Sequence, residues 1–155
     1  MARKTKELFI KTADIIIENK NYLTELDAAI GDGDHGVNLA RGFNKLKEKL
    51  EAESFESRSE LFKLTAMTLI SNVGGASGPL YGTAFLNISK VISETELSLD
   101  DLIEISEEAI AGIQKRGKAE AGEKTMLDTI IPAAESLKNS RTNNLNLNTA
   151  LNNCL

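Results

Sequence analysis

Apolar side chains recur along this chain at the spacing of one helical face. Phe9, Ala13, Ile16 and Ile17 lie at i, i+4, i+7 and i+8 and predict a helix over residues 5–20. The same spacing predicts five further helices, over residues 36–50, 62–73, 80–92, 98–113 and 125–138. Runs of alternating β-branched residues, which would indicate strands, do not occur in the sequence. The pattern therefore predicts an all-α protein.

Local signals refine the later helices. Ser98 followed by Asp101 has the spacing of a capping box and marks a helix start. Pro132 falls inside the last strongly periodic segment and removes a backbone donor, so we expect a kink or a late helix start there. The Asn-rich stretch 139–153 is low in hydrophobicity and predicts a loop followed by a weak or frayed final helix.

The connections between these helices are short, which favours an antiparallel up-and-down bundle. Eight of the 11 glycines fall in three of the connections, at Gly31, Gly33, Gly36, Gly74, Gly75, Gly78, Gly117 and Gly122. In an antiparallel bundle these three connections emerge at the same end. The sequence therefore predicts three glycine-rich loops side by side, with a binding site at that end.

The first loop carries three aspartates, Asp27, Asp32 and Asp34, which only a folded loop would bring together. Converging carboxylates repel one another unless they bind a cation, and oxygen-only ligands favour Mg²⁺ or Ca²⁺. An EF-hand fits poorly, because the position for its bidentate Glu holds Asn38 when counted from Asp27 and Phe43 when counted from Asp32. Mg²⁺ with phosphate fits better, although a simple turn before a capped helix is the alternative.

The same loop contains the only histidine of the chain, His35, directly before the helix expected from Gly36. A helix N-terminus favours phosphate. His35 is a candidate donor to a phosphate or a ribose, or else a helix cap. In the second loop, residues 73–80, free backbone N–H groups and the Ser77 hydroxyl are suited to phosphate. A tight connection with Pro79 in the first turn of the next helix is the alternative.

The third loop, residues 117–125, resembles a phosphate-binding P-loop in composition. It has one residue too many before the Lys124-Thr125 pair and follows a helix rather than a strand, so the P-loop assignment fails. A solvated charged loop is the alternative, with Lys118, Lys124 and Thr125 as candidate contacts to phosphate or to a partner.

Bulk properties narrow the classes of function. The formal charge of -5 argues against a nucleic-acid partner, which would favour a basic face. No apolar run approaches the ~20 residues that cross a bilayer, so we expect no membrane insertion. The single cysteine, Cys154, cannot form an internal disulfide. We therefore expect a soluble cytoplasmic protein of one domain.

Taken together, the motifs at residues 26–38, 74–80, 116–119 and 122–126 occur in the order found in the dihydroxyacetone kinase L subunit, which the chain resembles over roughly residues 5–138. The resemblance implies an antiparallel helical barrel that binds Mg-nucleotide at one end. It implies that Asp27, Asp32 and Asp34 coordinate two Mg²⁺ ions on the phosphates of ADP or ATP. It places further residues around the nucleotide: His35, Gly36, Asn38, Ala76, Ser77, Gly117 and Met126.

The resemblance also implies partners. A K subunit holds dihydroxyacetone, and in the phosphotransferase-system version a phosphohistidine protein, the M subunit, recharges a resident ADP. A short free-standing chain is more similar to that version than to the ATP-dependent one, and a homodimer is compatible with either. The family continues beyond residue 155 with a lid loop and closing helices, so we expect weakened ADP binding here.

Two rival functions follow from the same residues. Domains that phosphorylate carrier-bound fatty acids share the Asp-Gly-Asp signature, but typically have threonine where this chain has His35. The other rival is a metal-stabilised scaffold or an inactive regulatory remnant. A ligand that binds the native state raises its stability. Thermal stabilisation by Mg²⁺ and nucleotide would therefore favour the kinase hypothesis, and its absence would favour the scaffold.

Overall fold

The protein is built from helices throughout the part of the chain described by the computed structural model, residues 1–154. No strand occurs in this range, so the all-α prediction is confirmed. The helices are α1 (Ala2–Glu18), α2 (Lys20–Ala28), α3 (His35–Ala52), α4 (Arg58–Asn72), α5 (Ser77–Val91), α6 (Leu99–Gly117), α7 (Leu127–Thr142) and α8 (Leu147–Asn153).

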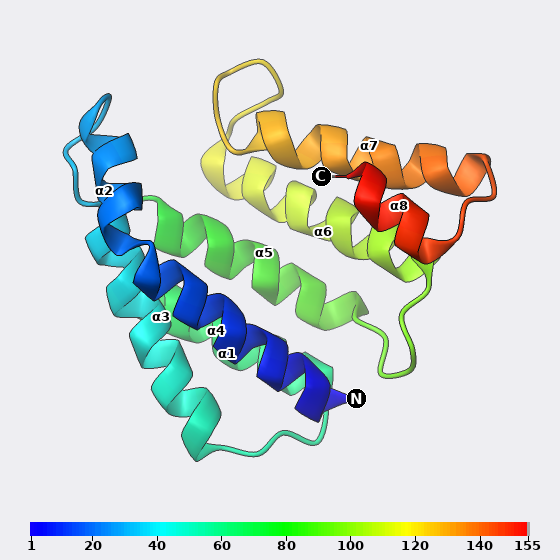
Figure 1. Cartoon of the computed structure of the whole chain (residues 1–155), viewed down its shortest axis with the longest axis horizontal. Helices are drawn as coiled ribbons and strands as arrows, with labels where there is room; N and C mark the ends of the chain where they lie inside the picture. Colours follow the sequence, from blue (N-terminus) through cyan, green and yellow to red (C-terminus); the bar gives the residue numbers. More distant parts are fainter. Residues whose placement is uncertain (155) are drawn as a thin grey trace.

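The helices pack largely against their neighbours in the chain and run up and down (Figure 1). From α3 to α7 each helix packs on the next, α8 lies on α7, and both α1 and α2 pack on α3. Figure 1 shows the α2–α3, α4–α5 and α6–α7 connections at the same end of this arrangement. The antiparallel bundle with its three glycine-rich loops at one end is therefore confirmed.

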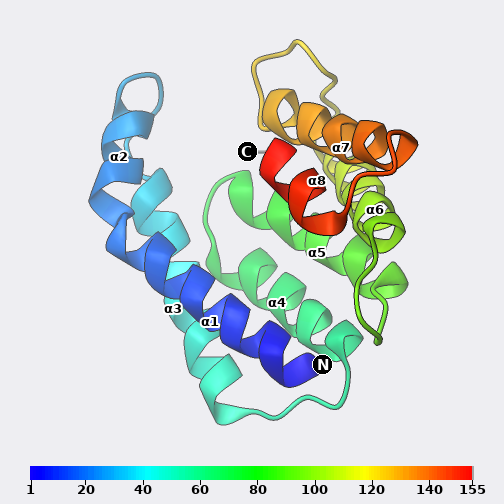
Figure 2. The same cartoon turned by 45° about the vertical axis from the view of Figure 1, so that its right-hand side comes forward.

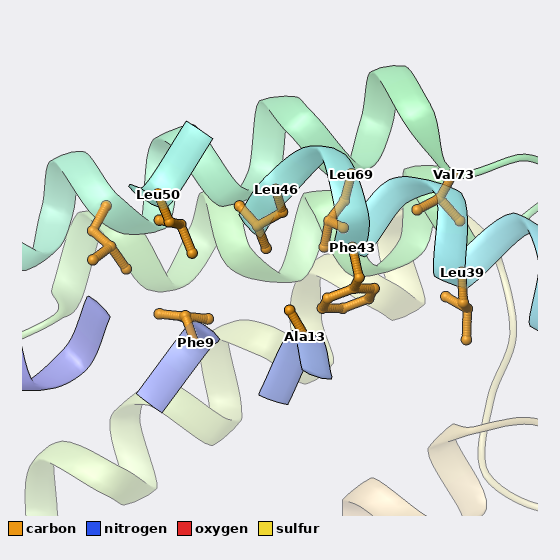
Figure 3. Packing of buried hydrophobic residues seen from close by; sticks show 9 residues of the cluster. Phe9, Ala13, Leu39, Phe43, Leu46, Leu50, Leu69 and Val73 are labelled. Carbon is orange, nitrogen blue, oxygen red and sulfur yellow. The ribbon is translucent and has the colours of Figure 1, made fainter. Parts of the chain in front are cut away.

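The larger core is formed by α1, α3 and α4, with contributions from α5. Figure 3 shows its tightly packed members, among which Leu46 and Leu50 are completely buried. Phe9 meets Phe62 edge to face at a centroid distance of 5.1 Å, and Phe85 completes the aromatic group. Burial of each large apolar side chain contributes about 1.5–3 kcal/mol, so this core holds the first half of the chain together.

A second, smaller core joins α5, α6 and α7 around Ala84, Ile113 and Leu127. Leu127 is completely buried although it is the first residue of α7. This anchors the beginning of α7 directly below the third glycine-rich connection. In Figure 2, α6 and α7 lie on the far side of α5 from α1 and α3, so the two cores are separate layers on either side of α5.

One helix is not predicted by the apolar pattern. Residues 26–28, expected as loop, form the end of α2, and the first helix ends at Glu18 instead of residue 20. The physical reason is that α2 has no buried residue, and therefore no apolar face that signals a helix. Its apolar side chains Tyr22 and Leu26 are exposed, and Leu23 is only partly buried against the larger core.

The remaining elements lie where the pattern predicts them, with ends displaced by a few residues. The capping box of Ser98 and Asp101 is confirmed, and Ser57 with Glu60 forms a second one. Pro132 lies within α7, which starts five residues before it, so a helix start at the proline is wrong. The weak final helix is confirmed as α8.

None of the helices described is long and apolar enough to span a membrane.

Candidate functional site

Asp27, Asp32 and Asp34 converge at the end of the bundle. Each offers a carboxylate oxygen within 4.8 Å of the oxygens of the other two, with Asp27 half-buried and the others exposed. Three negative charges at this spacing repel one another unless a cation lies between them. Hard oxygen donors on a short loop fit Mg²⁺ in particular, which keeps several positions for water and phosphate oxygens.

The loop that gathers the aspartates is folded by backbone contacts. At the end of α2 the carbonyl of Asp27 accepts N–H groups from Ile30 (3.0 Å) and Gly31 (2.6 Å). Gly33 then adopts a left-handed φ of +71°, which costs glycine little and reverses the chain toward α3. This brings Asp32 and Asp34 back over the side chain of Asp27.

The loop is seated on α2 through Gly36, whose position leaves no room for a side chain. A Cβ there would overlap the carbonyl oxygen of Lys20 and the hydroxyl of Thr24. Gly36 thus serves the close packing of α3 on α2. Its nucleotide contact stays a prediction.

The N-terminus of α3 faces the cluster, and its first N–H groups are bonded to one of the aspartates. One oxygen of Asp27, Oδ2, accepts N–H groups from Asp34 (3.0 Å) and His35 (3.3 Å). Asp34 itself is the N-cap residue and makes no side-chain cap bond. The partial positive charge of a helix N-terminus adds to the site's affinity for anions.

Asn38, one turn into α3, is buried and orients Asp34. Its amide donates to Oδ2 of Asp34 at 2.5 Å, and its carbonyl oxygen accepts from Arg41 at 2.8 Å. Arg41 also donates to the carbonyl of Asn72 at the end of α4. The chain of bonds fixes one metal-ligand candidate against the second loop.

The second loop touches the first through two of the predicted residues. The hydroxyl of Ser77, the first residue of α5, lies 3.2 Å from Nδ1 of His35. Both side chains are half-buried. The sequence placed these residues in separate motifs 42 positions apart, and the fold brings them together.

A cavity of about 430 Å³ lies between the second and third loops. It is lined by Ala76, Pro79, Leu80, Ile113, Arg116, Gly117, Ala119, Thr125, Met126 and Leu127. The lining is mainly hydrocarbon with one cationic side chain at Arg116, a composition typical of pockets for flat organic groups. Three predicted residues, Ala76, Gly117 and Met126, line it, whereas His35, Gly36, Asn38 and Ser77 do not.

The cavity and the acidic cluster meet at the start of α5. Ala76 lines the cavity, and the adjacent Ser77 contacts His35, which follows Asp34 in the chain. This adjacency would suit a ligand with a flat apolar group at one end and phosphates at the other. In this arrangement the cavity is suited to the apolar end of such a ligand, and the acidic cluster with a bound cation is suited to its phosphate end.

The sequence reasoning missed one residue that bonds to the third loop from the helix after it. Asp128, in the first turn of α7, accepts backbone N–H groups from Gly122 and Thr125, and these bonds hold the pKa of its carboxyl below the usual range. Thr125 followed by Asp128 has the Ser/Thr-x-x-acid spacing that identified Ser98 and Asp101. That signal was sufficient to find it.

Comparisons with known proteins agree with one another. The model of the family described as the DAK2 domain matches residues 29–155. The ADP-binding subunit DhaL of the PTS-dependent dihydroxyacetone kinase of Lactococcus lactis is 56% identical over 124 residues, which are 80% of this chain and 62% of that protein. The ADP-binding subunit DhaL of PEP-dependent dihydroxyacetone kinase 1 of Listeria innocua is 49% identical over 120 residues, covering 77% and 61%.

The corresponding subunit of the Escherichia coli PEP-dependent enzyme is 44% identical over 142 residues, covering 91% of this chain and 68% of that protein. The chain thus spans about three fifths to two thirds of the length of these relatives. The crystal structure of the dihydroxyacetone kinase of C. freundii matches 89% of this chain and 25% of its own chain, with a TM-score of 0.73 and 24% identity. That likeness concerns the fold.

Proposed function

The chain belongs to the DAK2 domain family, and from this premise we propose that it is the nucleotide-carrying subunit of a dihydroxyacetone kinase, transferring a phosphoryl group to dihydroxyacetone held on a separate K subunit. The observation that carries the proposal is the convergence of three carboxylates beside a helix N-terminus and a mainly apolar cavity. The names of the similar proteins, which describe ADP-binding subunits of this kinase, support it.

In this proposal Asp27, Asp32 and Asp34 hold two Mg²⁺ ions against the phosphates of ADP or ATP. The ions would neutralise phosphate charge and align the transferred group. The chain's own contribution is positioning: Asp27 fixes the start of α3, and Asn38 fixes Asp34. The acceptor belongs to the partner, so no general base is required from this chain.

The proposed nucleotide contacts divide between the two ends of the ligand. Ala76, Gly117 and Met126 receive the base in the cavity that they line. His35 and Ser77 lie at the boundary with the acidic cluster and are suited to donate to phosphate or ribose oxygens. Gly36 and Asn38 act by keeping the first loop in place.

The donor that we propose is a phosphohistidine M subunit that recharges a bound ADP, as expected for the PEP-dependent form named in the similar proteins. The fatty-acid alternative is disfavoured by His35 and by those names. The non-catalytic alternative is compatible with the same converging aspartates, and the names of the similar proteins disfavour it.

The test is reconstitution. The chain is combined with a K subunit, an M subunit and the phosphotransferase components, and PEP-dependent formation of dihydroxyacetone phosphate is measured. Asp32→Ala and Asp34→Ala are expected to abolish transfer while the helical circular dichroism is unchanged. Glu25→Ala, an exposed acid on α2, serves as the control and retains activity. Full transfer by the aspartate variants would refute the proposal, and loss of their helical signal would indicate a structural role instead.

A further inference from the structure

The third loop, together with Met126 that follows it, forms one wall of the cavity. Ala119, Thr125 and Met126 line the cavity and are half-buried, whereas most other side chains of the loop are exposed. A Cβ added at Gly122 would meet no atom within 4 Å, so the tip of the loop lies free of the bundle. Ala119 and Met126 pack against the second core, whereas residues 120–124 between them are exposed, so apolar burial contributes little to the conformation of the tip.

The backbone of this loop is also conformationally demanding. Lys118, Gly122 and Lys124 have positive φ values of 53°, 92° and 57°. Residues with a Cβ rarely adopt this conformation, because the Cβ approaches the following carbonyl oxygen. The loop therefore depends on contacts that offset this conformational cost.

Asp128 fastens the exposed tip of the loop to the start of α7. Its Oδ1 accepts the N–H of Gly122 at 2.5 Å, and its Oδ2 accepts the N–H of Thr125 at 2.8 Å. Both carboxylate oxygens of Asp128 therefore accept hydrogen bonds, from residues on either side of the left-handed Lys124. The neighbouring Leu127 is completely buried, so the carboxylate extends from a fixed point of the bundle.

We propose that Asp128 is a positioning residue for nucleotide binding, which holds the third loop as the wall of the base cavity before the ligand arrives. The proposal rests on the proposed function, because it assigns the cavity to the nucleotide. Asp128 does not line the cavity, so its effect passes through Thr125 and Met126. A loop fastened in advance loses less conformational freedom on binding, which raises affinity.

A purely structural role is the competing explanation, since an acid in the first turn of a helix also stabilises the helix. The two roles differ in what they change. Helix stabilisation affects thermal stability alone, whereas positioning affects the amides of Gly122 and Thr125 and the affinity for nucleotide.

The experiment compares the wild-type chain with Asp128→Asn, which keeps the shape but presents a donor to one of the two N–H groups. Glu135→Gln, an exposed acid on the same helix, is the control. Calorimetry measures the Kd of ADP in the presence of Mg²⁺, and NMR hydrogen exchange measures the two amides without nucleotide. We expect a Kd raised at least tenfold and faster exchange in Asp128→Asn, with the control unchanged.

An unchanged Kd in folded Asp128→Asn would overturn the inference. Wild-type amides of Gly122 and Thr125 that exchange as fast as those of an open loop would also overturn it, and this measurement needs no variant. Absence of ADP binding by the wild-type chain would instead refute the proposed function, while protected amides would still establish the fastened loop.

Discussion

One carboxylate oxygen of Asp27 accepts the backbone N–H of Asp34 at 3.0 Å, so the first aspartate of the cluster caps the helix that begins beside the third. The same oxygen also accepts from His35. Asp27 therefore serves the fold and the proposed metal site at once. Asp32 is exposed and serves the cluster only.

This difference predicts unequal costs. Asp27→Ala should lower the free energy of unfolding by about 1–2 kcal/mol through loss of the cap, and should also abolish metal binding. Asp32→Ala should abolish metal binding and leave the metal-free protein as stable as before or slightly more stable, because one repulsive charge is removed. Urea unfolding with EDTA and with Mg²⁺ measures both. Equal losses of metal-free stability in the two variants would contradict the division of roles.

Gly36→Ala tests whether the close packing of α2 and α3 sets the geometry of the aspartates. The added Cβ would overlap the Lys20 carbonyl, so the helices must separate, at a cost of about 1–3 kcal/mol. We expect reduced metal affinity as well, because Asp27 lies on α2 and Asp34 on the start of α3. Gly75→Ala is the comparison, since the added methyl meets no atom there and only the left-handed φ is penalised. Normal Mg²⁺ binding by Gly36→Ala would show that the cluster tolerates movement of α2.

The sequence predicted the helices that bury an apolar face and missed the one that does not. In α3, for example, the helical spacing of Phe43, Leu46 and Leu50 predicts the helix. α2 has no fully buried residue: Leu23 packs only partly against the larger core, and the helix lies close to α3 at Gly36. No periodicity within residues 20–28 carries that information, because the decisive contact lies in another helix.

For the site, residue types were predictable and contacts were not. The aspartates between glycines predicted a cation site, and the antiparallel topology predicted that the three glycine-rich loops lie at one end of the bundle. The pairing of Ser77 with His35 depends on how α5 is placed against α3, which no local pattern encodes. Asp128 differs from these residues, because its spacing from Thr125 is that of a capping box and could have been recognised in the sequence. It lies next to a loop rich in charged residues, among which it was overlooked.

Ser77→Ala tests the contact between the first two loops. Loss of the hydroxyl removes its interaction with His35, at a cost of about 1 kcal/mol or less, because both groups are only half-buried. We expect a several-fold weaker affinity for nucleotide, since the phosphate end and the base end of the site are joined here. Ser71→Ala, at an exposed position near the end of α4, is the control for calorimetry with Mg-ADP. Identical affinities in the two variants would remove Ser77 from the proposed site.

Arg58→Met should separate stability from binding. Arg58 is buried, and its guanidinium donates to Thr5 and to the carbonyls of Ser93 and Thr95, away from the acidic cluster. Its loss leaves these acceptors without their partner, so we expect destabilisation of about 1–3 kcal/mol. The Kd of Mg-ADP should not change while the protein is folded. Thermal melting and calorimetry on one sample check both, and a matching loss of affinity would show that the two ends of the bundle are coupled.

The lowered pKa of Asp128 predicts how its contribution depends on pH. The N–H groups of Gly122 and Thr125 favour the charged carboxylate in the folded chain, so the folded pKa lies below the ordinary value of about 3.9. Between these two values the unfolded chain binds more protons, and stability rises with pH. The contribution is therefore fully present above the ordinary pKa and is lost as the pH falls through the folded pKa. Asp101, whose pKa is lowered by Ser98, follows the same rule and contributes to the same loss of stability at acid pH.

The variant Asp128→Asn isolates the part of this pH-dependent stability that comes from Asp128. Its Tm should lie below that of the wild-type chain by a constant difference from pH 7 to about pH 5. The difference should shrink at lower pH, because a protonated aspartate and an asparagine both lack the charge that the two N–H groups stabilise. Melting curves in steps of half a pH unit measure this, with Glu135→Gln as the control without a bonded carboxylate. A Tm difference that persists undiminished at the acid end would mean that the loop responds to the shape of the side chain and not to its charge.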